Sequence, residues 1–321
     1  MFERIFKLSE HKTTVKTEVM AGITTFMTMA YILAVNPSVL GSTGMDTTAV
    51  LLATALASCL GTLCMAFMAN LPFALSAGMG LNAFMAYTVV AGYGYSWQVA
   101  LLAVFIEGLI FIVLSLTNVR EAIFNAIPLT LKKGVSVGIG LFIAFIGLQN
   151  SGLCVDSATL VGIISFPENF HTAGICALLT LIGLFFTAVF YTRKMKGAIL
   201  YGILLTWILG MLCQVTGLYV PTPDAGFYSL FPSWGMTDFS KLGLTFGQCF
   251  NVDFSAVGIV NFIVVIFSFL FVDIFDTLGT LIGVATKAKM LDKDGKLPGI
   301  KPALLADSIA TSAGAILGTS T

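Results

Sequence analysis

Long apolar stretches separated by short polar segments make up most of the chain. Each stretch is close to the ~20 residues that an α-helix needs to cross the hydrocarbon core of a bilayer. The pattern predicts an all-α, multi-pass membrane protein with nine candidate spans. These spans are expected at 19–40, 49–70, 73–92, 97–117, 128–149, 172–191, 197–217, 254–285 and 303–319.

The basic residues predict how the spans are oriented, because lysine and arginine gather on the cytoplasmic side of a membrane. If the spans alternate, fifteen of the sixteen lysines and arginines lie on one side and only Lys241 lies on the other. This asymmetry supports the span count and predicts a cytoplasmic N-terminus. Residues 1–18 mix acidic, basic and apolar side chains, so we expect an amphipathic segment at the membrane surface.

The number of spans before the polar segment at 218–253 is seven, which is odd. A second copy of the same unit would therefore begin from the opposite face, as in the inverted repeats of secondary transporters. A faint sequence echo supports a repeat, since the pattern Leu-Leu-Ala, Ala and Gly at 51–61 recurs at 304–314. These residue types are abundant here, so the echo alone decides little.

Composition excludes several classes of function. Hydrophobic residues make up 57% of the chain and charged residues 10%, and the mean hydropathy is +0.97, which is typical of membrane proteins. Basic tracts with interleaved aromatic residues are absent from the sequence, which argues against nucleic acid as a partner. The six cysteines are scattered without a CxxC pair, and we expect neither a disulfide framework nor a metal site, nor any other cofactor.

The eighth span contains two carboxylates in its second half, Asp273 and Asp276. An acid at the centre of a span costs about 2.5–3.5 kcal/mol on the insertion scale, so something must stabilise or use it. The spacing places both acids on one helix face, beside Thr277. Gly279 and Gly283 form a small-residue step that lets another helix approach closely. We therefore expect a substrate and proton site here, with Asp276 as its principal residue and Asp273 as a supporting partner.

The third span is predicted to be broken. Pro72 and the glycines Gly78 and Gly80 favour an extended run followed by a helix that begins near Gly78. Free backbone N–H groups at that helix start can serve polar atoms of a substrate. Asn82 lies one turn further on, and two roles are left open for it. Its amide can contact the edge of a heterocycle, or it can hydrogen-bond a neighbouring helix.

The remaining polar residues of the apolar stretches are expected to be structural. We expect Glu107 to be a protonated or hydrogen-bonded contact between helices, and Asp307 to cap or fasten helix ends. Asn36 and Pro37 are expected to mark a helix end, and Asp253 to cap the start of the eighth span.

Four segments of the chain resemble a known family. They are GITTFMTMAYILAVNP at 22–37, LSAGMGLNAFMAYTVV at 75–90, FVDIFDTLGTLIGVA at 271–285 and ADSIATSAGAILGTST at 306–321. Together they resemble the AzgA-like branch of the nucleobase–cation symporter-2 family, which are permeases for adenine, guanine and hypoxanthine. The resemblance implies a fourteen-span fold of two inverted seven-span repeats, with about nine spans present here and short strands in spans three and ten.

The resemblance also implies a domain division. Residues 1–18 lead into core spans one to four at 19–118, and gate spans five to seven occupy 119–217. After the outer polar segment at 218–253, residues 254–321 begin the second core repeat, and the chain stops before span ten. Whether the chain is a fragment is left open.

Site residues are implied by the same motifs. Asn82 falls on the third-span polar position, and Asp276 falls on the eighth-span acid that binds the base and is tied to proton coupling. The turn that faces the ligand comprises Ser76, Ala77, Gly78, Met79 and Gly80.

The function implied is proton-coupled import of a purine by alternating access across the inner (plasma) membrane, without catalytic residues. Its partners are a purine base, protons and the lipid bilayer, while a homodimer, the preferred purine and the coupling stoichiometry are left open. One alternative is an anion transporter or channel of the same fold, which a carboxylate such as Asp276 disfavours by repelling an anion. A remote alternative is an intramembrane aspartyl protease, which needs two acids on facing segments, whereas these lie on one helix.

Overall fold

The computed structural model describes residues 2–11, 13–117, 119–158, 160–195, 197–232, 235, 237–254, 257–293 and 296–320. Within these ranges, eight helices are long and apolar enough to cross a membrane, and a shorter apolar helix spans Met79–Gly92. The predicted all-α, multi-pass fold is therefore confirmed. Lys12 and Lys196, two of the basic residues counted for orientation, lie outside the described residues. The chain forms two compact units, Met1–Ile139 with Thr237–Thr321 and Gly140–Met236.

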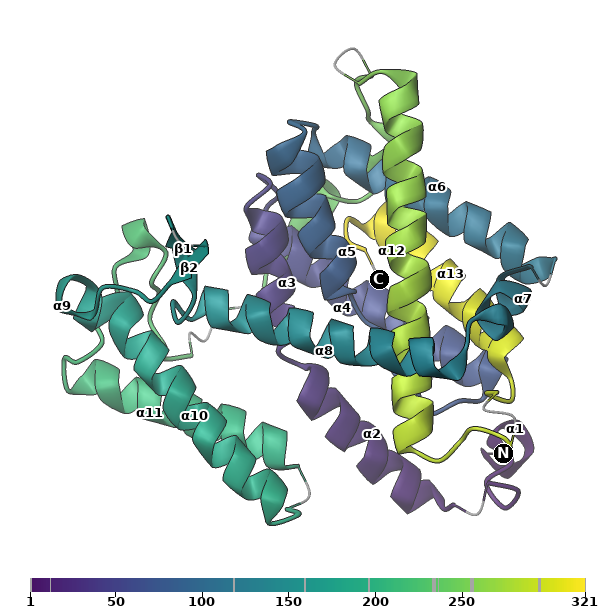
Figure 1. The fold of residues 1–321 in the computed structure, drawn as a ribbon, viewed down its shortest axis with the longest axis horizontal. Coiled ribbons are helices and arrows are strands. Elements are labelled where there is room, and N and C mark those ends of the chain that lie inside the picture. The colour runs from purple at the N-terminus through teal and green to yellow at the C-terminus, as the bar shows by residue number, and fades with distance from the viewer. Residues whose placement is uncertain are drawn as a thin grey trace. The chain divides into compact units, whose positions relative to one another are not determined.

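The first unit contains most of the long helices (Figure 1). The long helix α4 continues into the wider π-helical turn η1, and the short helix α5 continues into η2. Helix α8 begins in this unit and ends in the other. The elements of the first unit are α1 (Phe2–Phe6), α2 (Val15–Met29), α3 (Ile32–Gly41), α4 (Thr47–Cys64), η1 (Met65–Ala69), α5 (Met79–Ala83), η2 (Phe84–Gly92), α6 (Trp97–Leu116), α7 (Val119–Ala126), α8 (Leu129–Asn150), η5 (Phe239–Leu244), η6 (Gln248–Phe250), α12 (Ile259–Lys287) and α13 (Ile300–Leu317).

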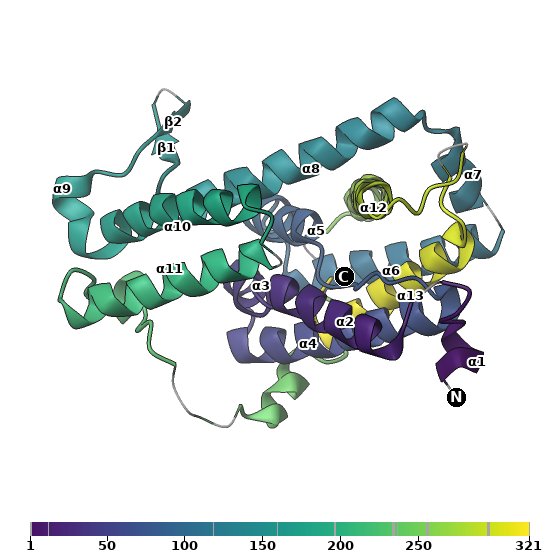
Figure 2. The same ribbon diagram turned by 90° about the horizontal axis from the view of Figure 1, so that it is seen from below.

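The core of this unit lies where α5, α6 and α12 meet, and Figure 2 shows these helices with α12 seen end-on. Buried Leu81 and Val104 belong to one apolar cluster with Phe269 of α12. The rings of Phe84 and Phe269 pack edge to face with their centroids 5.0 Å apart. Burial of these large side chains stabilises the contact between the third and eighth spans.

Close helix crossings depend on small residues. A Cβ added at Gly108 of α6 would lie 2.9 Å from the backbone nitrogen of Ser312 of α13. A Cβ added at Gly61 of α4 would lie 2.9 Å from the Ala310 Cβ of α13. Gly61 and Ala310 both belong to the sequence echo at 51–61 and 304–314, so the two echo helices cross each other directly.

The small-residue step on α12 accommodates a neighbouring helix, as the sequence predicts. A Cβ added at Gly279 would meet the Ile139 δ-methyl group and lie 3.3 Å from Val135 Cγ1, both on α8. A Cβ added at Gly283 would lie 3.2 Å from the Ser136 hydroxyl oxygen. That hydroxyl donates to the Gly279 carbonyl oxygen at 2.6 Å, so the close approach also gives a hydrogen bond between the helices.

The predicted break in the third span is confirmed. Residues 70–78 are not helical, and α5 begins at Met79 with Gly78 as its N-cap. Among the described residues the extended segment pairs with no other strand, so the implied pairing of strands in spans three and ten stays a prediction. Instead the Thr62 hydroxyl of α4 accepts from the Leu75 N–H at 3.1 Å and donates to the Leu75 carbonyl at 3.2 Å. A side chain therefore takes the hydrogen bonds that a partner strand would make.

Two expectations about helix ends are wrong. Pro37 lies inside α3, and the break falls at residues 30–31 instead. A proline disturbs the turn that precedes it, because its ring clashes with the carbonyl four residues back.

Asp253 does not cap α12, whose N-cap is Gly258. The buried residues Val257 and Phe262 flank that start, at the positions of a hydrophobic staple, so apolar packing and not the acid fixes it.

The second unit is built on an antiparallel pair of helices, α10 (Ile175–Thr192) and α11 (Ala198–Val215). They cross at reciprocal glycine–threonine contacts, because Cβ atoms added at Gly183 and Gly202 would meet Thr206 and Thr187 of the other helix. Each threonine hydroxyl donates at 2.7 Å to a glycine carbonyl of its own helix. The unit also contains η4 (Pro223–Ala225), α9 (Phe166–Asn169), η3 (Phe170–Gly174) and the antiparallel strands β1 (Val155–Ser157) and β2 (Leu160–Gly162).

Helix α4 and the π turn that extends it contact different segments of the first unit at their two ends. Near its start, Lys241 Nζ lies 3.2 Å from Asp46 Oδ2. The Ala49 N–H and then Lys241 lower the pKa of the Asp46 carboxyl group. Beyond its end, the Asn70 amide donates to the Phe6 carbonyl at 3.2 Å. Lys241, in the segment predicted to lie outside the cell, and Phe6, in the segment predicted to lie on the cytoplasmic side, are thus separated by the length of one span.

Candidate substrate and proton site

Helix α12 holds the two predicted acids in different surroundings. The Asp273 side chain is buried, and its Oδ2 lies 3.3 Å from Arg120 Nη2. The Thr277 hydroxyl is 3.2 Å from Asp273 Oδ1. Asp276 is half-buried, and within the described part of the chain its carboxylate takes part in no hydrogen bond or ion pair. Of the two acids, Asp276 is the one with acceptor oxygens available to a ligand.

Arg120, at the start of α7, joins α12 and α13. Its Nη2 lies 2.7 Å from Asp307 Oδ2, in addition to the contact with Asp273. Its Nη1 donates to the Leu304 carbonyl at 2.9 Å and to the Ser308 hydroxyl at 2.7 Å. Two carboxylates and several neutral acceptors thus compensate a buried guanidinium group. Asp307 fastens helices, as expected, although it lies inside α13 and not at its end.

Sequence reasoning missed Arg120 as a site residue, because it was counted only among the basic residues that follow the fourth span. A signal was present in the sequence. Three acids, Glu107, Asp273 and Asp307, lie in apolar spans, and buried carboxylates need a cation or a proton. Arg120 follows the fourth span closely and is the nearest base in the chain to Glu107.

Asn82 lies in a buried polar network. It is 0% exposed, its amide donates to the Asn36 side-chain oxygen, and it accepts from the Ser320 hydroxyl. Asn36 also donates to Thr54 at 2.7 Å and to Thr319 at 2.9 Å. The network joins α3, α4 and α5 to the residues after α13. Of the two roles left open for Asn82, the structure shows the hydrogen bonds to neighbouring helices, and contact with a base stays a prediction.

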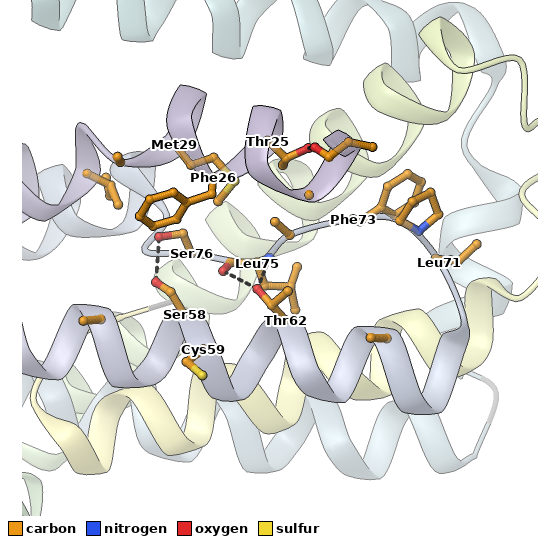
Figure 3. Close-up of a pocket in the computed structure, with 18 of the residues that line it drawn as sticks. Thr25, Phe26, Met29, Ser58, Cys59, Thr62, Leu71, Phe73, Leu75 and Ser76 are labelled. Atoms are coloured by element: carbon orange, nitrogen blue, oxygen red, sulfur yellow. Dashed lines mark hydrogen bonds between the residues drawn. The ribbon is translucent and has the colours of Figure 1, made fainter. Parts of the chain in front are cut away.

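A cavity of about 410 Å³ lies between α2, α4 and the extended residues 71–76 (Figure 3). Its size falls in the range of small-molecule sites, and its lining is mostly apolar. Ser76 lines it and exchanges a hydrogen bond of 2.8 Å with the Ser58 hydroxyl. Phe26 of α2 and Thr62 of α4 face the same space.

The predicted site residues lie in three parts of the first unit: at the cavity and the start of α5, in the amide network, and on α12. Ser76 lines the cavity, while Ala77 and Met79 are buried and Gly78 and Gly80 are half-buried at the start of α5. Asn82 lies in the amide network, and the two acids lie on α12. Neither Asn82 nor Asp276 lines the cavity. The cavity therefore contains only part of the predicted site.

Comparison with known proteins decides the family. Residues 16–321 match the model of a permease family. The chain belongs to that family. The match covers nearly all of the sequence, so it applies to both compact units.

Named relatives of this permease point to one branch. The adenine permease AdeP of Escherichia coli is 41% identical over 324 residues, which cover 100% of this chain and 67% of AdeP. The guanine/hypoxanthine permease PbuG of Bacillus subtilis is 44% identical, over 98% of this chain and 69% of PbuG. The nucleobase transporter PlAzg2 of Paenibacillus larvae is 32% identical, over 95% of this chain and 56% of PlAzg2. The resemblance to the AzgA-like branch of the nucleobase–cation symporter-2 family is confirmed.

Membership of this family makes the protein a multi-pass membrane transporter and not an enzyme. The protease alternative is thereby excluded. In this permease the broken third span and the acidic helix are direct neighbours, since Phe84 follows α5 and packs on Phe269. Asp273 lies about one turn beyond Phe269, and Asp276 about two turns beyond it.

Proposed function

We propose that this permease imports purine bases across the cytoplasmic membrane together with protons. Relatives that match almost the whole chain are named adenine and guanine/hypoxanthine permeases. The observation that carries the proposal is the Asp276 carboxylate, which is half-buried in a membrane span and takes part in no hydrogen bond or ion pair among the described residues. An acid in that setting is costly unless a ligand or a proton uses it.

A neutral purine offers ring N–H donors and ring nitrogen acceptors. The Asp276 carboxylate accepts from a ring N–H, and free backbone N–H groups at the start of α5 donate to ring nitrogens. Ser76, Ala77, Gly78, Met79 and Gly80 place those backbone groups at the break in the third span.

Proton coupling requires that the proton and the base favour each other's binding. A carboxyl group that leaves water holds a proton more readily, so Asp276 can accept a proton and then donate to a purine acceptor. Asp273, already paired with Arg120, positions this part of α12. Movement of a core domain past a gate domain then exposes the site to the other side. The core and gate boundaries and a homodimer are part of this proposal.

An anion transporter of the same fold is the competing proposal. A negatively charged ligand would be repelled by the Asp276 carboxylate, and Arg120 is already engaged by Asp273 and Asp307. Like charges in a poorly solvated site repel strongly. The structure therefore favours a neutral ligand.

The test is uptake of radiolabelled hypoxanthine and adenine by cells that produce the intact protein and lack purine permeases of their own. Competition with unlabelled adenine, guanine, xanthine and uracil defines the preferred base. We expect Asp276→Asn to reduce uptake by about tenfold or more, because a hydrogen bond to a charged group contributes about 1.5–3 kcal/mol.

The matched control is Asp156→Asn, which removes an exposed acid on β1 and should leave uptake unchanged. Absence of purine uptake by the parent protein would reject the proposed function. Undiminished proton-driven uptake by Asp276→Asn would reject the role assigned to that acid.

A further inference from the structure

We infer that Glu107 is a second proton-binding residue of this permease, and that it carries a driving proton separately from Asp276. The inference rests on the proposed proton coupling and adds to it a residue outside the predicted base site. It is drawn from the burial of Glu107 and from the charged groups that surround it.

Glu107 lies on α6 and is 0% exposed. Both of its carboxylate oxygens are buried without a hydrogen-bond partner among the described residues. An ionised carboxylate in this environment would lose its hydration without gaining a hydrogen bond in return. In the conformation seen here, Glu107 therefore holds a proton.

The charged groups that face Glu107 come from three of the elements packed against α6. They are Asp273 of α12, Asp307 of α13 and Arg120 of α7. The other described elements packed against α6, η2 and η6, present no charged group to it. Three acids thus share one cation, and the cluster carries one excess negative charge even when Glu107 is neutral.

The two terminal nitrogens of Arg120 are engaged by groups other than Glu107. Its Nη2 contacts Asp307 at 2.7 Å and Asp273 at 3.3 Å, and its Nη1 donates to Leu304 and Ser308. Two carboxylates can only accept hydrogen bonds, so Glu107 and Asp273 attract each other only when one of them carries a proton. Geometry thus makes proton occupancy of Glu107 and the ion pair of Asp273 depend on each other.

Release of the proton needs a route to water. Asp307 is the most exposed member of the cluster, with a side chain 14% exposed. When water reaches the cluster through this side, the Glu107 O–H bond breaks, the proton passes to water, and the carboxylate keeps the electron pair. Reprotonation reverses the step. Because Asp273 and Asp276 lie on the same helix, the charge of Glu107 acts on the element that carries the base-binding acid.

The first test compares the parent protein with Glu107→Gln, which has the shape of the protonated acid but cannot release a proton. Cells or vesicles are given labelled hypoxanthine and an imposed pH difference of about one unit. Each coupled proton then contributes about a tenfold factor to accumulation. We expect Glu107→Gln to accumulate about tenfold less base, to lose part of the pH dependence of uptake, and to retain base-for-base exchange.

The matched control is Glu168→Gln, an exposed site on α9, which should behave as the parent. Equal accumulation and an unchanged pH profile in Glu107→Gln would overturn the inference. Absence of hypoxanthine and adenine uptake by the parent would instead reject the proposed function.

A second measurement does not depend on how well the variant folds. Infrared spectra of the purified parent protein at neutral pH should contain the C=O band of a protonated carboxylic acid that accepts no strong hydrogen bond. Glu107→Gln should remove that band. A parent spectrum without the band, or a band that persists in the variant, would overturn the inference.

Discussion

Asp273 and Asp276 lie three residues apart on α12, but their side chains have different partners. Asp273 meets Arg120 and Thr277, whereas the Asp276 carboxylate takes part in no hydrogen bond or ion pair in the described part of the chain. A buried ion pair must offset the desolvation of both charges, which Arg120 achieves by also contacting Asp307. At this scale one acid holds helices together and the other is left for a ligand or a proton.

The buried amide network allows a prediction about a single residue. Asn36→Leu removes hydrogen bonds to Thr54, Thr319 and Asn82 without a large change of volume. The buried Asn82 amide then loses its acceptor, while the Thr54 and Thr319 hydroxyls still donate to backbone carbonyls. An unpaired buried amide should cost about 1–3 kcal/mol, so we expect a lower unfolding temperature for the purified protein. Asn125→Leu, at an exposed position on α7, is the control. Equal losses in the two variants would show that the network contributes little stability.

Helix contacts are the next scale, and here glycines fix how closely α6, α12 and their neighbours approach. The crossing of α6 and α13 depends on Gly108, which faces the backbone of Ser312. The contact between α12 and α8 depends on Gly279 and Gly283. In membranes such close approach replaces much of the hydrophobic driving force that operates in water.

This leads to a prediction for α6. Gly108→Ala places a methyl group 2.9 Å from the Ser312 backbone nitrogen, so the helices must separate. We expect a loss of about 1–3 kcal/mol in the free energy of unfolding. Gly134→Ala on α8 has no atom within 4 Å, and alanine is the better helix former by up to about 1 kcal/mol. Thermal unfolding should therefore rank Gly134→Ala at or above the parent, and the opposite ranking would contradict the crossing.

For the whole molecule, opposite ends of the first unit carry different segments. The Lys241–Asp46 contact lies at the start of α4, and the Asn70–Phe6 contact lies beyond the π turn that extends it. The charge asymmetry predicts that the end near Phe6 is cytoplasmic. Which end is cytoplasmic stays a prediction from the sequence, and the structure shows that the two contacts lie at opposite ends of α4 with its π turn.

Cysteine labelling tests this orientation. Phe239→Cys and Lys293→Cys are introduced singly into a protein whose six native cysteines are replaced by alanine. Both positions are exposed in the structure. A reagent that cannot cross membranes should label Phe239→Cys in intact cells and should label Lys293→Cys only after the cells are opened. The reverse pattern would place the N-terminus outside.

The sequence determined the features that act along a single helix. The lengths of the apolar stretches predicted the spans, and Pro72 with Gly78 predicted the break that the structure places before Met79. The spacing of Gly279 and Gly283 predicted a close helix contact, now identified as α8. Each of these features depends on backbone propensity or on side-chain periodicity, and both are determined by residues that are close together in the sequence.

Only the tertiary structure decided which distant side chains meet. Arg120 and Asp273 are 153 positions apart in the chain, and Asn82 and Ser320 are 238 positions apart. The start of α12 was predicted at Asp253 but lies at Ile259, where buried Val257 and Phe262 fix it. A buried charge or amide is satisfied by whichever partner the crossing helices bring to it, and no local pattern encodes that partner.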